Sequence, residues 1–106
     1  MKREKNENKK SEYDDQLIAA YLKITGRVQG VAFRYYARSM ANQLDVKGWI
    51  RNLSNGKVEL VVEGKKKAIK RMIKWCHSGP SMARVDRIQL EWGKYTGQFN
   101  QFSVRG

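Results

Sequence analysis

The sequence predicts an α+β domain in which two helices cover one face of a small, mainly antiparallel sheet. Several segments alternate apolar and polar residues, as strands with one buried face do, and two longer segments repeat apolar residues at helical spacing. An Asn55-Gly56 step between two strand-like segments is a strong hairpin signal. The chain has 106 residues, of which 41% are apolar, and this is enough for one core. We therefore expect a single domain.

The first half of the domain reads as a strand, a helix and a hairpin. Residues 20–24 place an apolar side chain at every second position, which predicts a strand that ends at Thr25-Gly26. A loop with two glycines leads into an apolar stripe that is typical of an amphipathic helix ending near Asp45. Residues 48–53 and 57–63 are predicted strands on either side of the turn. The helical stripe consists of Phe33, Ala37, Met40, Ala41 and Leu44.

The second half adds a helix and two strands. The helix is predicted to end at Gly79-Pro80-Ser81, because Gly suits a helix C-terminus and Pro cannot continue the turn. A strand with alternating apolar residues follows over 88–92, then a turn-rich link over 93–98, and a last short strand around Phe102 and Val104. The apolar stripe of the helix is Ile69, Met72, Ile73 and Cys76, and its basic residues are Lys66, Lys67, Lys70, Arg71 and Lys74.

The predicted order of elements is β-α-β-β-α-β with a short terminal strand. Two helices cannot cover both faces of so small a sheet, so we expect them to share one face and to leave the other partly open to water. This arrangement is a ferredoxin-like sandwich. Because the fold carries enzymes, RNA-binding modules and regulatory domains, it does not decide the function.

Residues 1–15 differ in composition from the rest of the chain. They contain equal numbers of acidic and basic side chains and only two apolar ones, so we predict a mobile charged tail and a folded domain over 16–106. The net charge of +12 therefore falls on the domain and favours anionic partners. The single Cys and the lack of a signal-like or membrane-spanning apolar stretch lead us to expect a cytoplasmic protein with no membrane association.

The loop Gly26-Arg27-Val28-Gln29-Gly30-Val31 joins the first strand to the first helix and is a candidate anion site. Glycines allow successive backbone N–H groups to converge, and the first N–H groups of a helix lack internal partners. Arg34, in the first helical turn, adds a guanidinium that can bind two phosphate oxygens at once. An ordinary strand-to-helix turn with a surface arginine explains the same spacing, which fits neither a Walker nor a Rossmann phosphate loop. The spacing alone leaves both interpretations open.

Two longer motifs favour the anion site. Gly26-Arg27-Val28-Gln29-Gly30-Val31-Ala32-Phe33-Arg34 closely resembles the first signature of the acylphosphatases. Gly48-Trp49-Ile50-Arg51-Asn52, followed by Asn55-Gly56-Lys57-Val58-Glu59, is similar to the second signature, and the resemblance extends over about residues 18–106. Ile50 stands where Val or Ala is more usual, and Gly106 stands where a larger residue is often found. Neither departure touches the expected site.

The resemblance implies a ferredoxin-like enzyme that hydrolyses the carboxyl-phosphate bond of small acyl phosphates to a carboxylate and inorganic phosphate. It implies that Arg34 binds the phosphoryl group and that Asn52 positions the attacking water. It also implies action without a metal, a cofactor or a phosphoenzyme. A carboxylate, whose conjugate acid has a pKa of about 4, departs without a proton donor. We expect the backbone N–H groups of the 26–31 loop to bind the phosphoryl oxygens together with Arg34.

Other features have simpler explanations. Cys76 lies on the apolar stripe of the second helix and is expected to pack there, and a lone His77 lacks the further ligands that a metal site needs. The basic helix face offers contacts for nucleic acid, but the aromatic strand motif of RNA-binding domains is missing. We therefore do not expect nucleic-acid binding. Separately, we expect the protein to be a monomer. We interpret the scattered aromatic residues mainly as core or loop packing: Trp49, Trp75, Trp92 and Tyr95.

Overall fold

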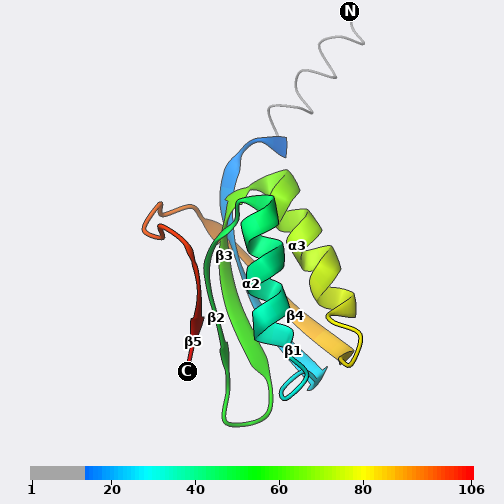
Figure 1. Ribbon diagram of the computed structural model, residues 1–106. Coiled ribbons are helices and arrows are strands. Elements are labelled where there is room, and N and C mark those ends of the chain that lie inside the picture. The colour runs from blue at the N-terminus through cyan, green and yellow to red at the C-terminus, as the bar shows by residue number, and fades with distance from the viewer. Residues whose placement is uncertain (1–13) are drawn as a thin grey trace, which may run out of the picture.

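The computed structural model describes residues 14–106, and this range follows the predicted order of elements (Figure 1). The predicted mobile tail over 1–15 lies outside the described residues except for Asp14 and Asp15. The described elements are β1 (Leu17–Arg27), α2 (Phe33–Leu44), β2 (Lys47–Asn52), β3 (Val58–Lys65), α3 (Lys66–Ser78), β4 (Arg84–Lys94) and β5 (Phe102–Arg105).

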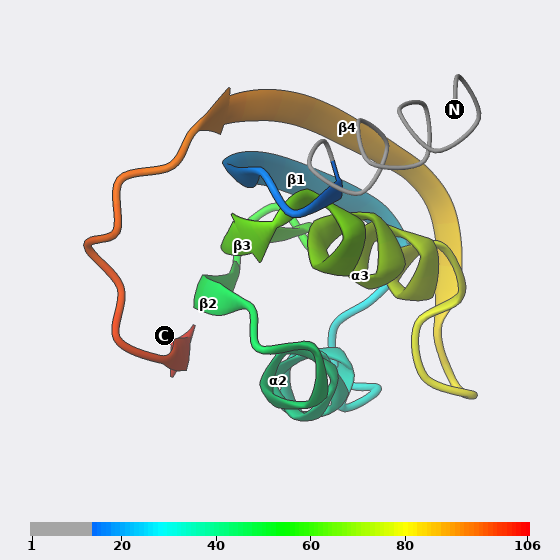
Figure 2. The same cartoon turned by 90° about the horizontal axis from the view of Figure 1, so that it is seen from above.

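The five strands form one sheet in the order β4-β1-β3-β2-β5. All neighbouring strands pair antiparallel except β2 and β5, which are parallel. Both helices lie on one face of the sheet, and Figures 1 and 2 show the other face without a helix. The prediction of a ferredoxin-like α+β sandwich is therefore confirmed. No helix within residues 14–106 is long and apolar enough to cross a membrane.

Strands β1 and β4 are longer than the alternating sequence pattern predicts. β1 continues through Gly26 to Arg27, because it stays paired with β4 after a register shift between Thr25 and Gly26. β4 begins at Arg84 and extends to Lys94, into the segment predicted as a turn-rich link. Backbone hydrogen bonds hold these extensions, and such bonds need no alternation of side chains. The apolar pattern therefore marks only the middle of each strand.

Helix α2 packs on the sheet through small residues. Ala37 and Ala41 are fully buried, and the helix contacts β2 and β5. Phe33, at the start of the helix, is also buried and lies against Trp75 of α3, with the two ring centroids 5.2 Å apart. Close packing of this kind leaves α2 little freedom. It fixes the first turn of α2, and with it Arg34, beside the sheet.

Two of the aromatic residues interpreted as packing residues are largely exposed. Trp92 is 50% exposed and Tyr95 is 44% exposed, so neither belongs to the core, whereas Trp75 packs against Phe33. Trp92 lies on β4, an edge strand of the sheet, and Tyr95 follows this strand directly. A side chain on an edge strand has a neighbouring strand on one side only. Alternation therefore indicates the direction of these side chains but not their burial.

Candidate active site

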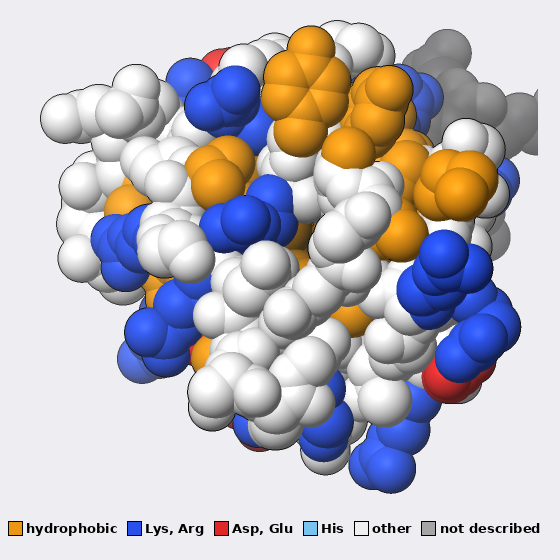
Figure 3. Space-filling view, turned by 60° about the horizontal axis from the view of Figure 1, so that its bottom comes forward, with side chains coloured by type: hydrophobic (Ala, Val, Ile, Leu, Met, Phe, Trp, Pro, Cys, Tyr) orange, Lys and Arg blue, Asp and Glu red, His pale blue; other side chains and the backbone are white. Residues whose placement is uncertain are grey.

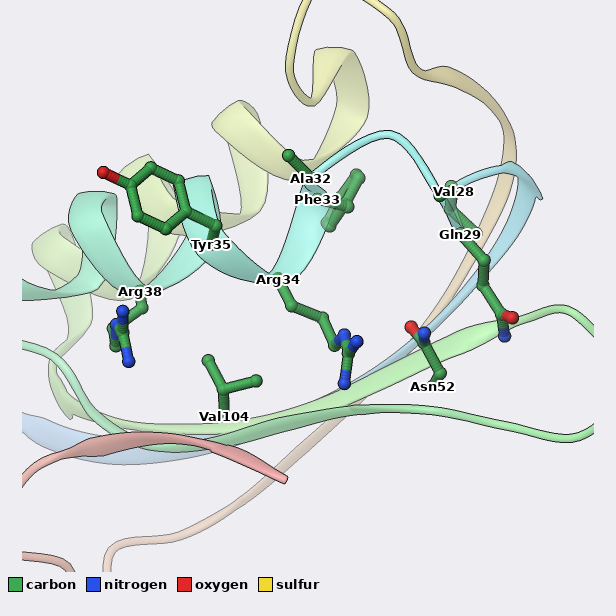
Figure 4. A pocket seen from close by; sticks show the side chains of 10 residues that line it. Val28, Gln29, Ala32, Phe33, Arg34, Tyr35, Arg38, Asn52 and Val104 are labelled. Atoms are coloured by element: carbon green, nitrogen blue, oxygen red, sulfur yellow. The ribbon is translucent and has the colours of Figure 1, made fainter. Parts of the chain in front are cut away.

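A cavity of about 280 Å³ lies where β1 ends and α2 begins (Figure 4). Its walls come from the loop after β1, the first two turns of α2, the end of β2 and the strand β5. It joins the two motifs noted in the sequence, since Arg34 ends the first motif and Asn52 belongs to the second. The lining residues are Val28, Gln29, Gly30, Ala32, Phe33, Arg34, Tyr35, Arg38, Asn52 and Val104.

The loop before α2 presents the positive end of this helix to the cavity. Gly30 and Ala32 adopt left-handed backbone conformations with φ angles of 75° and 62°, which glycine adopts readily and alanine only at a cost. Ala32 is the N-cap of α2 and makes no side-chain capping hydrogen bond, and the first turn carries no acidic residue. The first N–H groups of α2 therefore have neither a partner within the helix nor a side-chain cap. Such a helix end favours an anion.

Arg34 extends from the first turn of α2 toward β5. Its Nη1 donates a hydrogen bond to the backbone carbonyl oxygen of Arg105, at 3.1 Å. The other guanidinium N–H groups of Arg34 make no hydrogen bond with the described residues. They are available to a ligand.

Trp49 lies on the helix-free face and holds the end of β5 rather than filling the core. The guanidinium carbons of Arg105 and Arg51 lie 4.7 Å and 5.4 Å from the centroid of the Trp49 ring.

Asn52 ends strand β2 and lines the cavity beside Gln29 of the loop (Figure 4). Its Oδ1 atom is buried and has no hydrogen-bond partner among the described residues. Gln29 holds the loop beside it, because Nε2 of Gln29 donates to the backbone oxygens of Leu53 at 2.7 Å and of Lys57 at 2.9 Å. These two hydrogen bonds hold the loop against the β2–β3 hairpin, next to the Oδ1 atom of Asn52, which accepts no hydrogen bond from a described residue. A bound water supplies a donor to this atom.

The loop residues predicted to bind the substrate divide into two groups. Val28, Gln29 and Gly30 line the cavity, whereas Gly26, Arg27 and Val31 do not. The side chains of Val28 and Val31 are buried in the core, and Arg27 is exposed at the end of β1. Gly26 has a packing reason of its own, because a Cβ atom there would lie 2.1 Å from the carbonyl oxygen of Arg84. Only part of the loop therefore borders the cavity.

Three lining residues that lie outside the two motifs were missed by the sequence analysis. Arg38 follows Arg34 by four positions, so the two side chains share one face of α2, and this helical spacing is a signal that the sequence contains. Tyr35 comes from the same helical turn as Arg34. Val104 belongs to β5, which reaches the cavity only because β5 pairs with β2. Tertiary pairing of this kind leaves no local pattern.

A second polar cluster lies on the helix-free face of the sheet. Glu59 in β3 is 6% exposed, and its carboxylate accepts hydrogen bonds from the Tyr21 hydroxyl at 2.5 Å and from Nε of Arg51. Burial by itself raises the pKa of Glu59, but the hydrogen bonds from Tyr21 and Arg51 and the charge of Arg51 lower this pKa overall. Burial, and then the hydrogen bond to Glu59, raise the pKa of Tyr21 to about 12. Tyr21 and Arg51 thus supply hydrogen bonds to the buried carboxylate of Glu59.

Cys76 and His77 belong neither to the cavity nor to the cluster around Glu59. Cys76 is fully buried on α3, as expected for a packing residue, and burial raises the pKa of its thiol to about 12. The thiol is therefore not ionised at neutral pH and is a poor nucleophile. His77 is exposed near the end of α3. Within residues 14–106, no three His, Cys, Asp or Glu side chains are grouped so that they could hold a metal ion.

Known proteins resemble this chain over nearly the whole described domain. The model of the acylphosphatase family matches residues 20–104. The acylphosphatase of Chloroflexus aurantiacus is 49% identical over 88 residues, which cover 83% of this chain and 96% of that protein. The range that the family model matches contains both motifs and every residue that lines the cavity.

Solved structures agree with the sequence comparison. An acylphosphatase from Coxiella burnetii has a TM-score of 0.80 at 35% identity, with 84% of this chain and 93% of that chain covered. An acylphosphatase from Bacillus subtilis has a TM-score of 0.81 at 27% identity, with 86% of this chain and 100% of that chain covered. The resemblance noted in the two motifs is thereby confirmed, and the chain belongs to the acylphosphatase family of hydrolases.

Proposed function

We propose that the cavity hydrolyses small acyl phosphates to a carboxylate and inorganic phosphate by direct attack of a water molecule that Asn52 positions. The observation that carries this proposal is the unpaired, buried Oδ1 of Asn52 in the same cavity as the Arg34 guanidinium and the uncapped end of α2. One wall thus offers an acceptor for water, and the other offers donors for an anion.

The phosphoryl group binds at the positive end of α2. Backbone N–H groups of the loop and of the first helical turn, with the free N–H groups of Arg34, donate to its oxygens. The hydrogen bond from Arg34 to the carbonyl oxygen of Arg105 fixes the guanidinium before the substrate arrives. Donors that are already oriented stabilise the charge on the transferring phosphoryl group without a cost of reorganisation.

Asn52 positions the nucleophile. Its Oδ1 accepts a hydrogen bond from the water, whose oxygen then attacks phosphorus in line with the bond to the leaving carboxylate. The new P–O bond forms as the bond to the carboxylate breaks, and a phosphoryl oxygen takes the proton of the water. No protein side chain becomes phosphorylated in this scheme, because the water itself forms the new bond.

The lining of the cavity suits an acyl phosphate better than a phosphate monoester. The side chains that line it are neutral or basic. A carboxylate leaves without help, because its conjugate acid has a pKa of about 4. An alkoxide leaving group requires a proton donor or a metal ion. The proposed substrates are therefore mixed anhydrides of a carboxylic acid and phosphoric acid.

The proposal is tested by following benzoyl phosphate hydrolysis in the presence of EDTA. We expect rapid release of phosphate that EDTA does not affect, together with far slower cleavage of p-nitrophenyl phosphate. Inorganic phosphate should compete with the substrate, because it fits the same donors. If added protein leaves the decay of benzoyl phosphate unchanged, the proposed reaction is wrong.

A further inference from the structure

The cavity extends past the groups that the proposed reaction uses. Figure 4 shows Arg34 between Asn52 and Val104, and Arg38 beyond Val104. Tyr35 also lines the cavity, but Figure 4 shows its ring directed away from Arg38 and Val104. Val104 and Arg38 have no task in binding the phosphoryl group or the water. They border the space that remains for the acyl part of a substrate.

In-line attack fixes the direction in which the acyl group points. A water held by Asn52 reaches phosphorus from one side, so the bond to the leaving carboxylate lies on the opposite side. The acyl chain therefore extends away from Asn52, toward Val104 and Arg38 (Figure 4). This step rests on the proposed function, which places the water at Asn52.

Arg38 is suited to bind an anion at the far end of this space. It lies one helical turn after Arg34 on the same face of α2, and residues at this spacing have Cβ atoms about 6 Å apart. Its side chain is exposed and makes no hydrogen bond or ion pair with the described residues. A free guanidinium binds a carboxylate through two parallel hydrogen bonds. Arg38 thus offers a second anion contact at a fixed distance from the first.

The space between the two arginines has an apolar side. Val104 lines this space and is 37% exposed, so it presents methyl groups to a molecule in the cavity. A short methylene chain fits this surface. We propose that the preferred substrates are acyl phosphates with a short acyl chain that ends in a free carboxylate, and that Arg38 is the specificity-determining residue that binds this carboxylate.

General attraction of anions is the competing explanation for Arg38. Figure 3 views the end of the molecule that carries the loop and the hairpin, and it shows many Lys and Arg side chains and few Asp or Glu side chains. A field of this kind attracts every phosphate compound and favours extra charge without a specific contact. The test must therefore compare substrates of equal size and variants of equal net charge.

Two four-carbon substrates make the comparison. Succinyl phosphate carries a free carboxylate where butyryl phosphate carries a methyl group. We expect the wild-type protein to hydrolyse succinyl phosphate with a kcat/KM about tenfold higher, which corresponds to about 1.4 kcal/mol. Equal kcat/KM values for the two substrates overturn the inference. Failure to hydrolyse either one contradicts the proposed function instead, so the two failures are distinguishable.

Two variants then locate the contact. Arg38→Gln should lower kcat/KM for succinyl phosphate about tenfold and for butyryl phosphate only about twofold, so that the preference is largely lost. Arg71→Gln removes the same charge from the exposed surface of α3 and should keep the preference. An equal loss for both substrates in Arg38→Gln, or an equal loss of preference in Arg71→Gln, shows that only the general field acts and overturns the assignment.

Discussion

The cavity and the helix-free face of the sheet both place polar groups beside β2, but these groups are paired very differently. Arg51 and Asn52 are neighbours in sequence, and successive side chains of a strand point to opposite faces. On the helix-free face, Arg51 and Tyr21 both donate to the buried carboxylate of Glu59. On the other face, the buried Oδ1 of Asn52 has no partner among the described residues.

This difference separates polar groups that stabilise the fold from polar groups that serve the reaction. A buried polar atom without a partner costs roughly 1–3 kcal/mol, whereas a satisfied one contributes to stability. The protein itself offers no donor to Oδ1 of Asn52 among the described residues, so this atom accepts its hydrogen bond from a water or a ligand in the cavity. We expect substitutions in the cavity to lower activity with little loss of stability, and substitutions in the Glu59 cluster to do the reverse.

Replacement of Arg34 should have the largest effect on activity. Arg34→Ala removes the charged fork from the phosphoryl group, so we expect kcat/KM for benzoyl phosphate to fall by about 10³. The free energy of unfolding should change by less than about 1 kcal/mol, because the hydrogen bond to Arg105 is exposed. The matched control is Arg51→Ala, which should lose stability and keep most of its activity. A loss of stability in Arg34→Ala with activity retained, together with a loss of activity in Arg51→Ala, would contradict the division between groups that serve the reaction and groups that stabilise the fold.

Asn52→Ala should lower kcat by about 10², because the water loses the group that positions it. No described residue donates to Oδ1, so the change breaks no hydrogen bond of this atom within the described residues, and the free energy of unfolding should change by less than about 1 kcal/mol. Asn55→Ala is the control: its Oδ1 accepts from the N–H of Lys57 at 3.1 Å, so this variant should lose stability and retain activity. A clear loss of stability in Asn52→Ala would show that the atom is satisfied in solution.

The two glycines of the loop should differ in their importance for stability. Gly26→Ala forces a Cβ atom against the backbone of β4, and we expect denaturant unfolding to show a loss of roughly 3 kcal/mol. At Gly30 nothing lies within 4 Å of an added Cβ, so only the cost of the left-handed conformation remains, about 1–2 kcal/mol. Equal losses of stability in the two variants would show that the contact with the Arg84 carbonyl oxygen is not the reason for a glycine at position 26.

Glu59→Gln should lower the free energy of unfolding by about 2 kcal/mol at neutral pH and change kcat/KM by less than about twofold. The folded-state pKa of Glu59 is below its ordinary value of 4.5, so this stabilisation is present above pH 4.5 and is lost as the pH falls through the folded-state pKa. Stability curves between pH 7 and pH 2 should therefore converge for the wild type and the variant. Parallel curves would contradict the pairing of the Glu59 carboxylate with Tyr21 and Arg51.

Most of the fold was predictable from the sequence, because alternation and helical spacing record which side chains face the core. Leu60 and Val62 point to the helices and Glu59 to the other face, as the pattern of the hairpin indicates. Burial of Glu59 was not predictable, because it depends on Tyr21 and Arg51 from two other strands. The lengths of β1 and β4 also depend on backbone pairing rather than on side chains.

The site was predictable only in part. Arg34 and Asn52 followed from the resemblance of two motifs, and the spacing of Arg38 was readable but was not used. Val104 and the carbonyl oxygen of Arg105 enter the site through the parallel pairing of β5, which has no local signature. The predicted monomeric state, the lack of nucleic-acid binding and the cytoplasmic location stay predictions.

Binding of inorganic phosphate tests most directly whether the unpaired groups of the cavity form an anion site. We would measure the free energy of unfolding against phosphate concentration at constant ionic strength. The wild-type protein should gain about 2.7 kcal/mol at a concentration of one hundred times Kd, as Arg51→Ala should, whereas Arg34→Ala should gain little. An equal gain in Arg34→Ala, or no gain in the wild type, would contradict the account.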